Sequence, residues 1–341
     1  MKNFIPLWAL LIFSLMLVSC QQVQQRKTAS ESNQSAPPTK LDTLNQEVSS
    51  DSLNPQNYYF RSCYYLEQKD INRSLADINK AIQLNGKKSD YFVTLSEIYL
   101  EMGRMPNCME ALRKAEELDP VNKNALLKLA EAYLLLKDYQ NVFGYTKRTL
   151  DLDKMNPKAY FLRGFAYTEL GDTALAIRNF QAAADQDQNY YEAYLELGAI
   201  YSAQKNPLAA GYLETATRIA PGRGEAFYLL GLAYQEQENI PKAVETYEKL
   251  LKVIPDFKEA IYNLGYINLV YVQDFKEAIG YFTRAISLDP KYTDAYFNRG
   301  YSYELLGDLV NARKDYEKAL ELYPNYERPI AGLNRLDSLS E

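Results

Sequence analysis

A period of 34 residues, which begins at residue 55, constrains the fold of this chain more than any other feature. Eight units follow one another, and positions are numbered here from the first residue of each unit. Position 11 is tyrosine in seven units and Asn268 in the seventh unit. Position 8 is small in every unit: Ser62, Ser96, Ala130, Gly164, Gly198, Gly231, Gly265 and Gly300. A repeat of this length indicates stacked supersecondary units, none of which buries its apolar face alone.

Each unit reads as a pair of packed helices. Apolar residues recur at helical spacing in both halves of a unit. Small residues at position 8, and mostly small ones at position 20, let two helices approach closely. Proline ends five of the units and disfavours continuation of the second helix, at Pro120, Pro221, Pro255, Pro290 and Pro324.

Over residues 55–324 these residues resemble the pattern of the tetratricopeptide repeat family. The resemblance implies an all-α fold, a right-handed superhelical solenoid of eight helix pairs whose first helices line a concave groove. Residues 325–341 are predicted to form a C-terminal capping helix, because a terminal unit must shield its outer face from water.

Three units depart from the pattern. Unit three holds Val142, Thr146 and Thr149 at positions where small or aromatic residues are expected, with Gly144 in mid-helix, so we expect a less rigid second helix there. Unit five is one residue short near Asn206, which predicts a bend between residues 190 and 225. Unit seven is one residue long near residues 272–273.

The first 19 residues are predicted to be a signal peptide. Lys2 precedes an apolar run over residues 4–18, which is too short for a comfortable membrane span. The run ends in Ser19 and Cys20, and residues 17–20 resemble the lipobox of bacterial lipoproteins, which implies lipid attachment at Cys20. An ordinary signal peptide with a chance cysteine is the alternative. Gln21 resembles the outer-membrane class, so we expect a bacterial cell-envelope protein, anchored in the outer membrane and facing the periplasm.

Residues 20–54 are predicted to form a flexible tether. The stretch after Cys20 is rich in Gln, Ser, Thr and Pro and contains no aromatic residue. Such a segment buries too little apolar surface to offset the entropy of ordering it.

Composition argues against several classes of function. The chain contains no histidine, and its three cysteines form no metal-ligand spacing, so we predict no catalytic residue, no metal and no cofactor. A formal net charge of −6 argues against nucleic-acid binding. Cys63 and Cys108 are interpreted as free thiols, with a disulfide between them as the alternative.

The resemblance places positions 2, 5, 9, 12 and 13 on the concave groove. Half of the residues at positions 5 and 9 are aromatic: Tyr59, Phe161, Phe165, Tyr228, Tyr262, Tyr266, Phe297 and Tyr301. The 40 groove positions hold 12 acidic residues, Glu97 and Glu131 among them, and one basic residue, Lys158. The pattern predicts a groove for a protein or peptide with apolar and basic side chains. Alternatively, the rings only pack against neighbouring first helices.

The leading hypothesis is therefore a membrane-anchored scaffold that binds proteins and supports assembly of an envelope complex. A glycan-binding lipoprotein directed at peptidoglycan, or a regulator of an envelope enzyme, is the alternative. The partner and the oligomeric state are left open by the sequence.

Overall fold

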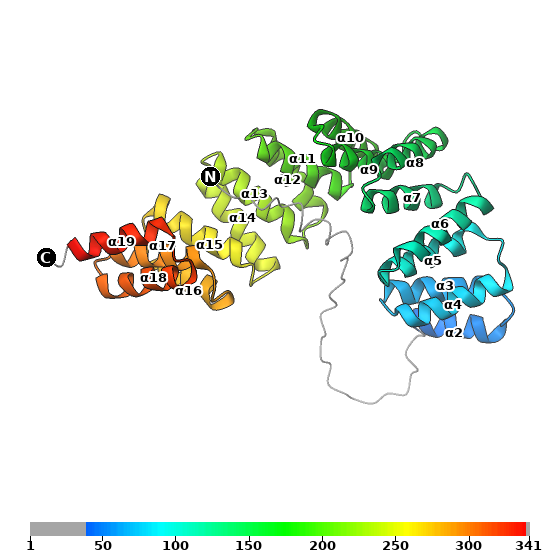
Figure 1. The fold of residues 1–341 in the computed structure, drawn as a ribbon, viewed down its shortest axis with the longest axis horizontal. Helices are drawn as coiled ribbons and strands as arrows, with labels where there is room; N and C mark the ends of the chain where they lie inside the picture. Colours follow the sequence, from blue (N-terminus) through cyan, green and yellow to red (C-terminus); the bar gives the residue numbers. More distant parts are fainter. Residues whose placement is uncertain (1–38, 339–341) are drawn as a thin grey trace, which may run out of the picture.

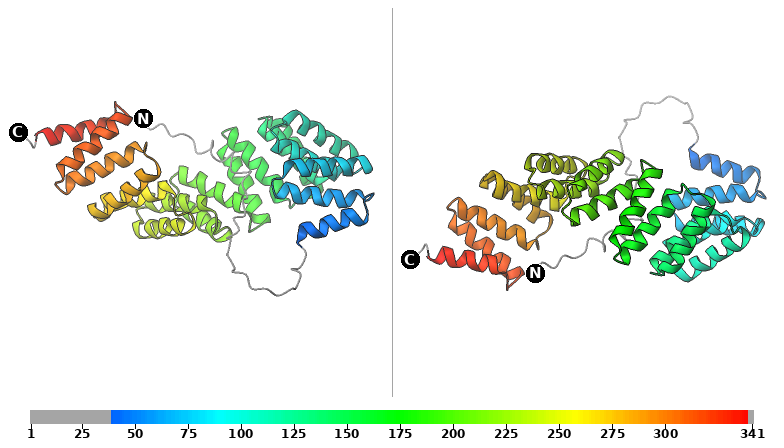
Figure 2. Two further views of the ribbon diagram at one scale, coloured as in Figure 1. Left: turned by 90° about the horizontal axis from the view of Figure 1, so that it is seen from below. Right: turned by 90° about the horizontal axis from the view of Figure 1, so that it is seen from above.

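The computed structural model describes residues 39–338, which form eighteen α-helices stacked in chain order along a curved, elongated body (Figure 1). Two further views show each helix lying against the next throughout this part of the chain (Figure 2). The predicted all-α solenoid is confirmed. Its eight units are α3 (Pro55–Glu67) with α4 (Ile71–Leu84), α5 (Ser89–Glu101) with α6 (Met105–Leu118), α7 (Lys123–Leu135) with α8 (Tyr139–Leu152), α9 (Pro157–Glu169) with α10 (Thr173–Gln186), α11 (Tyr191–Ala203) with α12 (Leu208–Ile219), α13 (Gly224–Glu236) with α14 (Ile240–Val253), α15 (Lys258–Ile267) with α16 (Phe275–Leu288), and α17 (Thr293–Leu305) with α18 (Leu309–Leu322).

The small residue at position 8 sets the distance between the two helices of a unit. A Cβ atom added to Gly231 would lie 2.3 Å from a ring carbon of Tyr247, which is fully buried on the second helix. A Cβ atom on Gly198 would lie 2.5 Å from the side chain of Leu213. The large side chain at position 24 therefore occupies the space that the missing side chain at position 8 leaves.

In all eight units the turn between the two helices contains one residue with a left-handed backbone conformation. This residue has a positive φ of 56–82° and lies at position 15, or at position 16 in the longer unit seven: Lys69, Gly103, Lys137, Gly171, Lys205, Glu238, Gln273 and Gly307. In unit one the Asp70 amide donates to the Tyr65 carbonyl at 2.8 Å, and the Lys69 amide donates to the Leu66 carbonyl at 3.0 Å. This left-handed cap satisfies carbonyls at the helix end and reverses the chain.

The extra residue of unit seven is absorbed by a π-helical turn, η1 (Asn268–Val272), which continues α15. The wider turn accommodates one more residue before the left-handed Gln273, so the second helix keeps its usual place. The Asn268 amide donates to the Leu264 carbonyl at 2.9 Å. The irregularity predicted near residue 272 is thus a local bulge.

Unit three forms a second helix of ordinary length. Val142, Thr146 and Thr149 are all fully buried in the 14-residue α8. The Thr146 hydroxyl donates to the Val142 carbonyl at 2.7 Å, which satisfies the buried oxygen. The lower rigidity expected of α8 stays a prediction. In unit five α12 is shortened to 12 residues, and the bend expected there also stays a prediction.

A helix that precedes unit one corrects the predicted tether. Thr39 caps α2 (Lys40–Ser50) in a capping box with Asp42, and Leu44 and Val48 are buried. The prediction of a flexible segment through residue 54 is therefore wrong for α2, because two apolar residues four positions apart are enough for a helix that docks on a preformed surface. Residues 1–38, with the predicted signal peptide, Cys20 and most of the tether, lie outside the described residues.

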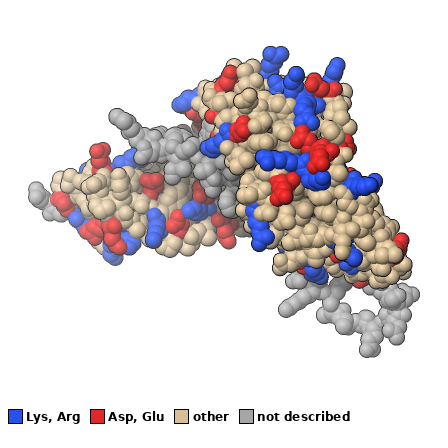
Figure 3. All heavy atoms as spheres, turned by 45° about the vertical axis from the view of Figure 1, so that its right-hand side comes forward, with Lys and Arg blue, Asp and Glu red and all other residues tan. Residues whose placement is uncertain are grey.

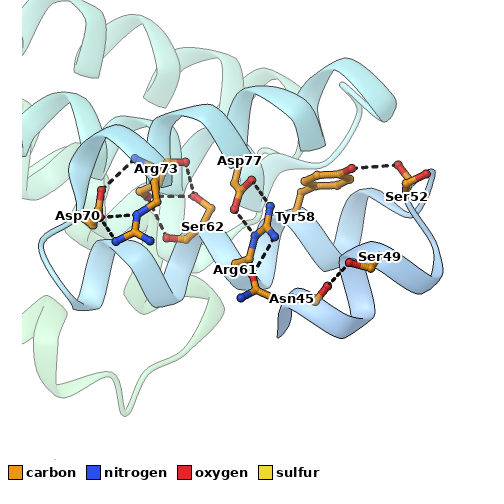
Figure 4. A network of polar contacts seen from close by, with 10 residues as sticks. Asn45, Ser49, Ser52, Tyr58, Arg61, Ser62, Asp70, Arg73 and Asp77 are labelled. Atoms are coloured by element: carbon orange, nitrogen blue, oxygen red, sulfur yellow. Dashed lines mark hydrogen bonds and ion pairs between the residues drawn. The ribbon is translucent and has the colours of Figure 1, made fainter. Parts of the chain in front are cut away.

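A polar network joins α2 to unit one (Figure 4). The Arg61 Nη1 donates to Asn45 Oδ1 at 3.0 Å, and Arg61 also forms an ion pair with Asp77 of α4. At the other end, α19 (Glu327–Ser338) covers the last unit, where Leu336 is buried in one cluster with Tyr316. The predicted capping helix is confirmed, and α2 provides a second cap that sequence reasoning missed.

Candidate binding site on the concave face

The concave face is built by the first helices. Several first helices contact the first helix of the next unit directly: α3 with α5, α5 with α7, α7 with α9, and α11 with α13. Elements on the inner side of a curved stack lie closest together, so this contact places the first helices on the inner wall. The predicted groove residues lie on these first helices.

The rings at position 5 are primarily structural. In units four, six, seven and eight each of them contacts a ring at position 24 and a ring at position 34 of its own unit. In unit seven Tyr262 lies 5.6 Å from Phe282 and 4.9 Å from Tyr292 between ring centroids. The same three-ring stacks are Phe161–Phe180–Tyr190, Tyr228–Tyr247–Phe257 and Phe297–Tyr316–Tyr326.

The rings at position 5 differ in their exposure to solvent. Phe161 is buried, at 5% exposed, and contributes to the core instead of the groove surface. Tyr59, Tyr228, Tyr262 and Phe297 are half-buried. The interpretation of the position-5 rings as packing residues therefore describes Phe161 fully and the others in part.

The rings at position 9 are better placed for a partner. Phe165, Tyr266 and Tyr301 are half-buried on the first helices. Phe165 lies 6.2 Å from Phe161, and Tyr301 stacks parallel to Phe297 with centroids 6.3 Å apart. Each of these two rings thus packs against a three-ring stack and keeps part of its surface exposed. The Arg335 guanidinium lies 5.9 Å from the centre of the Tyr301 ring.

The predicted acidic residues of the groove are largely paired. The Lys128 ammonium contacts Glu97 at 2.7 Å and Glu131 at 3.2 Å, and Lys158 also pairs with Glu131. Burial would raise the pKa of Glu131, but the two lysines outweigh it and hold the pKa below its ordinary value. Lys128 lies at position 6, which the resemblance did not assign to the groove.

Acidic residues at position 13 pair with lysines of the left-handed turns. Lys69 reaches Glu101 of the next unit at 2.6 Å, and the same contact recurs at 3.7 Å between Lys137 and Glu169 and at 3.3 Å between Lys205 and Glu236. Where the turn residue is Gly103 or Gly171, position 13 of the next unit is Leu135 or Ala203. These contacts form a ladder of ion pairs between units one and two, three and four, and five and six.

The remaining acidic positions follow the same trend. Glu67 pairs with Lys40, Glu304 with Arg335, Glu192 and Glu225 with Arg223, and Glu259 with Lys258. Asp90 accepts from Asn122, and Asp294 accepts from Tyr326. In the face that Figure 3 displays, acidic and basic side chains lie beside one another. Clustered acidic positions in the sequence therefore do not produce a bare acidic surface.

One acidic residue of the first helices was missed by sequence reasoning. Glu196, at position 6 of α11, is only 8% exposed. Burial raises the pKa of its carboxyl to about 7. Glutamate is rarely buried without a partner, so the sequence signal was a charged residue within the apolar stretch of α11.

The described residues contain no group of three or more His, Cys, Asp or Glu residues arranged to hold a metal ion. Cys63 and Cys108 are free thiols, and Cys108 is buried at a small-residue position, as expected. Burial raises the pKa of Cys63. Between residues 39 and 338, no helix combines the length and the hydropathy that a bilayer span requires.

Comparison with protein families identifies the repeat. Family models described as tetratricopeptide repeat match residues 55–88, 89–122, 161–224, 225–256, 258–292 and 293–326, which is more than half of the chain. Unit three lies outside these spans, and it is the unit with the most unusual second helix. The structure nevertheless gives it the same helix pair as its neighbours.

Similar proteins share short parts of this chain. The UDP-N-acetylglucosamine--peptide N-acetylglucosaminyltransferase of Giardia intestinalis is 37% identical over 24% of this chain and 6% of its own length. Protein O-mannosyl-transferase TMTC1 of Mus musculus is 32% identical over 34% of this chain and 12% of its own length. The mitochondrial import receptor subunit TOM70 of Rattus norvegicus is 26% identical over 39% of this chain and 20% of its own length. The chain thus spans a small fraction of each relative, and the two enzymes are matched through their repeats.

Solved structures share the fold. The C-terminal part of a TPR repeat-containing protein from Cytophaga hutchinsonii aligns with 71% of this chain and 99% of that chain, with a TM-score of 0.59 and 23% identity. The APC/C hetero-tetramer Cut9–Hcn1 aligns with 87% of this chain and 58% of that chain, with a TM-score of 0.51 and 15% identity.

Proposed function

This chain belongs to the tetratricopeptide repeat family, and from that premise we propose that it is a membrane-anchored adaptor whose concave face binds a segment of a partner protein. The half-buried rings of the first helices carry the proposal. They recur from Tyr59 in unit one to Tyr301 in unit eight, and Phe165 and Tyr301 rest on a rigid stack. Rings held in this way supply contact area at little entropic cost on binding.

The spread of these rings favours a protein segment over a glycan. A sugar site needs paired rings and hydrogen-bonding groups gathered in one pocket, whereas a peptide follows several units. Tyr59, Phe165, Tyr266 and Tyr301 lie on four different first helices. Binding to an envelope enzyme in order to regulate it would be one case of the same recognition.

The sequence supports the membrane anchor in this proposal. The resemblance of residues 17–20 to a lipobox supports lipid attachment at Cys20 and a place in the outer membrane facing the periplasm. Fractionation of the native host tests it: wild-type protein should sediment with outer membranes, and Cys20→Ala should not be lipidated. A Cys20→Ala protein that keeps the same lipid-shifted mass would refute the anchor.

The groove is tested with a variant at three half-buried positions, which leaves the fully buried residues unchanged. Phe165, Tyr266 and Tyr301 are replaced by serine together, and co-purifying proteins are then re-bound in purified form. The matched control replaces Tyr271 and Tyr323, which are 46% and 55% exposed, by serine. Loss of direct binding in the groove variant alone supports the proposal. Retained binding by a folded groove variant refutes it.

A further inference from the structure

Glu196 is a buried carboxyl group with no partner in the described part of the chain. Its side chain makes no hydrogen bond or ion pair with any residue between 39 and 338. Over the same residues, the fully enclosed side-chain nitrogen and oxygen atoms without a partner are Arg163 Nε and Ser202 Oγ. The carboxylate oxygens of Glu196 are not among them, so they retain access to the surface while the residue as a whole is 8% exposed.

The register of the units explains why this carboxyl group is unpaired. Position 6 lies in the seam between successive first helices, next to position 5 of the preceding unit. In unit eight the position-6 residue Asn298 donates to the Tyr262 hydroxyl at 2.7 Å. In the seam between α9 and α11, Phe161 takes the place of that tyrosine and offers no hydroxyl group. Glu196 therefore lacks the hydroxyl partner that the position-6 residue of unit eight has.

The residues beside Glu196 on α11 belong to an apolar and aromatic cluster. Ala193 and Leu197, which are three residues before it and one after it, belong to one cluster with Phe161. Phe165, a half-buried ring, packs against this cluster. An ionised carboxylate in such a place is unfavourable unless a cation accompanies it, and burial accordingly raises the pKa of Glu196 to about 7.

The other acidic residues of the concave face give a contrast. Glu192, one turn earlier on α11, is paired with Arg223 at 2.8 Å. Glu97 and Glu131 share Lys128. A ligand that approached any of these would compete with an ammonium or guanidinium group that is already in place. Among these four, Glu196 is the one that has no cation beside it within residues 39–338.

We propose that Glu196 is the anchor for a lysine or arginine side chain of the bound segment, whose aliphatic stem packs against Phe165. The inference rests on the proposed function, because it names the side chain that the groove selects. A cation that enters the seam would form a charge-assisted hydrogen bond in a poorly solvated place and stack near a ring, two interactions that reinforce each other. Apolar residues beside the cation would meet the cluster around Phe161.

The test is a selection from a phage-displayed library of random 15-residue peptides on immobilised purified residues 39–341, followed by affinity measurement of the enriched peptides by fluorescence anisotropy. The wild type is compared with Glu196→Gln, which keeps the shape of the side chain, and with Glu196→Lys, which reverses its charge. Glu192→Gln on the same helix is the matched control, and the serine variant of Phe165, Tyr266 and Tyr301 reports on the groove itself.

We expect wild-type peptides to carry Lys or Arg beside apolar residues, and their affinity to fall about tenfold or more in Glu196→Gln. Glu196→Lys should select Asp or Glu at that place, and Glu192→Gln should behave as wild type. If Glu196→Gln binds the same peptides with unchanged affinity while the serine variant loses them, the inference is overturned and the proposed function stands. If no peptide depends on the serine positions, the proposed function fails as well.

Discussion

Arg299 and Asp315 form a two-pronged ion pair between the helices of unit eight, with Nε–Oδ2 and Nη2–Oδ1 distances of 2.7 Å. Arg61 and Asp77 hold the same positions in unit one, at 2.7 and 2.8 Å. Unit four keeps the arginine, Arg163, but has Asn179 in place of the aspartate. There the Asn179 amide donates to its own helix at 2.8 Å, and Arg163 Nε is enclosed without a partner.

Asn179→Asp should complete this ion pair and raise the stability of the protein. A charge-assisted hydrogen bond to the enclosed Nε of Arg163 is worth roughly 1.5–3 kcal/mol. Thermal unfolding followed by circular dichroism measures the gain. Arg163→Met combined with Asn179→Asp should abolish it, because the new carboxylate would then be buried alone. A lower melting temperature for Asn179→Asp by itself would show that the geometry of units one and eight does not extend to unit four.

Replacing two helical glycines by alanine should change the stability of the protein in opposite directions. Gly231→Ala introduces a Cβ atom 2.3 Å from the Tyr247 ring and should destabilise by about 1–3 kcal/mol. Gly144→Ala meets nothing within 4 Å in the exposed middle of α8 and should stabilise by roughly 0.5–1 kcal/mol. Chemical denaturation of both variants provides the comparison, and hydrogen exchange of α8 in wild type tests its expected lower rigidity. Equal effects of the same sign would contradict the packing role of position 8.

Glu196 should make the protein less stable as the pH rises. The folded protein holds the proton of this carboxyl up to a pKa of about 7, whereas the unfolded chain releases it near the ordinary value of 4.5. Between these values the native state binds more protons, so stability falls with rising pH, and the loss is complete above pH ~7. Glu196→Gln should therefore raise the free energy of unfolding at pH 8 by up to about 3 kcal/mol and change little near pH 4.5.

The pH effect is isolated by subtracting the wild-type stability curve from that of the variant, since the other carboxylates are common to both. Glu192→Gln, which removes a half-exposed ion-pair partner, should show no such rise at pH 8. A difference curve for Glu196→Gln that is flat between pH 4.5 and 8 would mean that the carboxyl group is solvated.

Each ion pair between a turn lysine and a position-13 glutamate should contribute little to the free energy of unfolding. Lys69 and Glu101 are 2.6 Å apart, but their side chains are 52% and 26% exposed. A double-mutant cycle with Lys69→Met and Glu101→Gln should give a coupling of less than about 1 kcal/mol, which shrinks in 1 M salt. The same cycle at Arg299 and Asp315, exposed by 17% and 9%, should give a larger coupling that salt screens less. Equal couplings at the two sites would contradict the role assigned to burial.

The helix α2 should stabilise the first unit. Leu44→Ser together with Val48→Ser removes the two buried contacts of this helix and should expose residues 40–50 to proteolysis while units two to eight stay folded. Asn45→Ala is the milder comparison, since it removes the acceptor of Arg61 Nη1. Proteolysis at the same rate in wild type and the double variant would mean that α2 does not dock.

The helix pairs, their order and the capping helix followed from the period of 34 residues, because close packing of two helices demands small residues at fixed positions in every unit. The extra residue of unit seven was also visible as a break in the period, although its form as a π-helical turn was not. Each of these features depends on residues near one another in the chain, so repetition alone reveals them.

The charge and the exposed rings of the concave face depend on contacts between units. Counting acidic residues at five positions predicted an acidic groove, yet Lys128 comes from a sixth position and Lys69 reaches Glu101 from a turn 32 residues earlier. Phe161 is buried and Tyr301 is half-buried, although both were assigned to one set by position. The sequence by itself determined the repeat and therefore the fold. The tertiary structure decided which charges are neutralised, which rings stay partly exposed, and that Glu196 has no partner between residues 39 and 338. Burial and pairing depend on the neighbouring unit as much as on the residue itself.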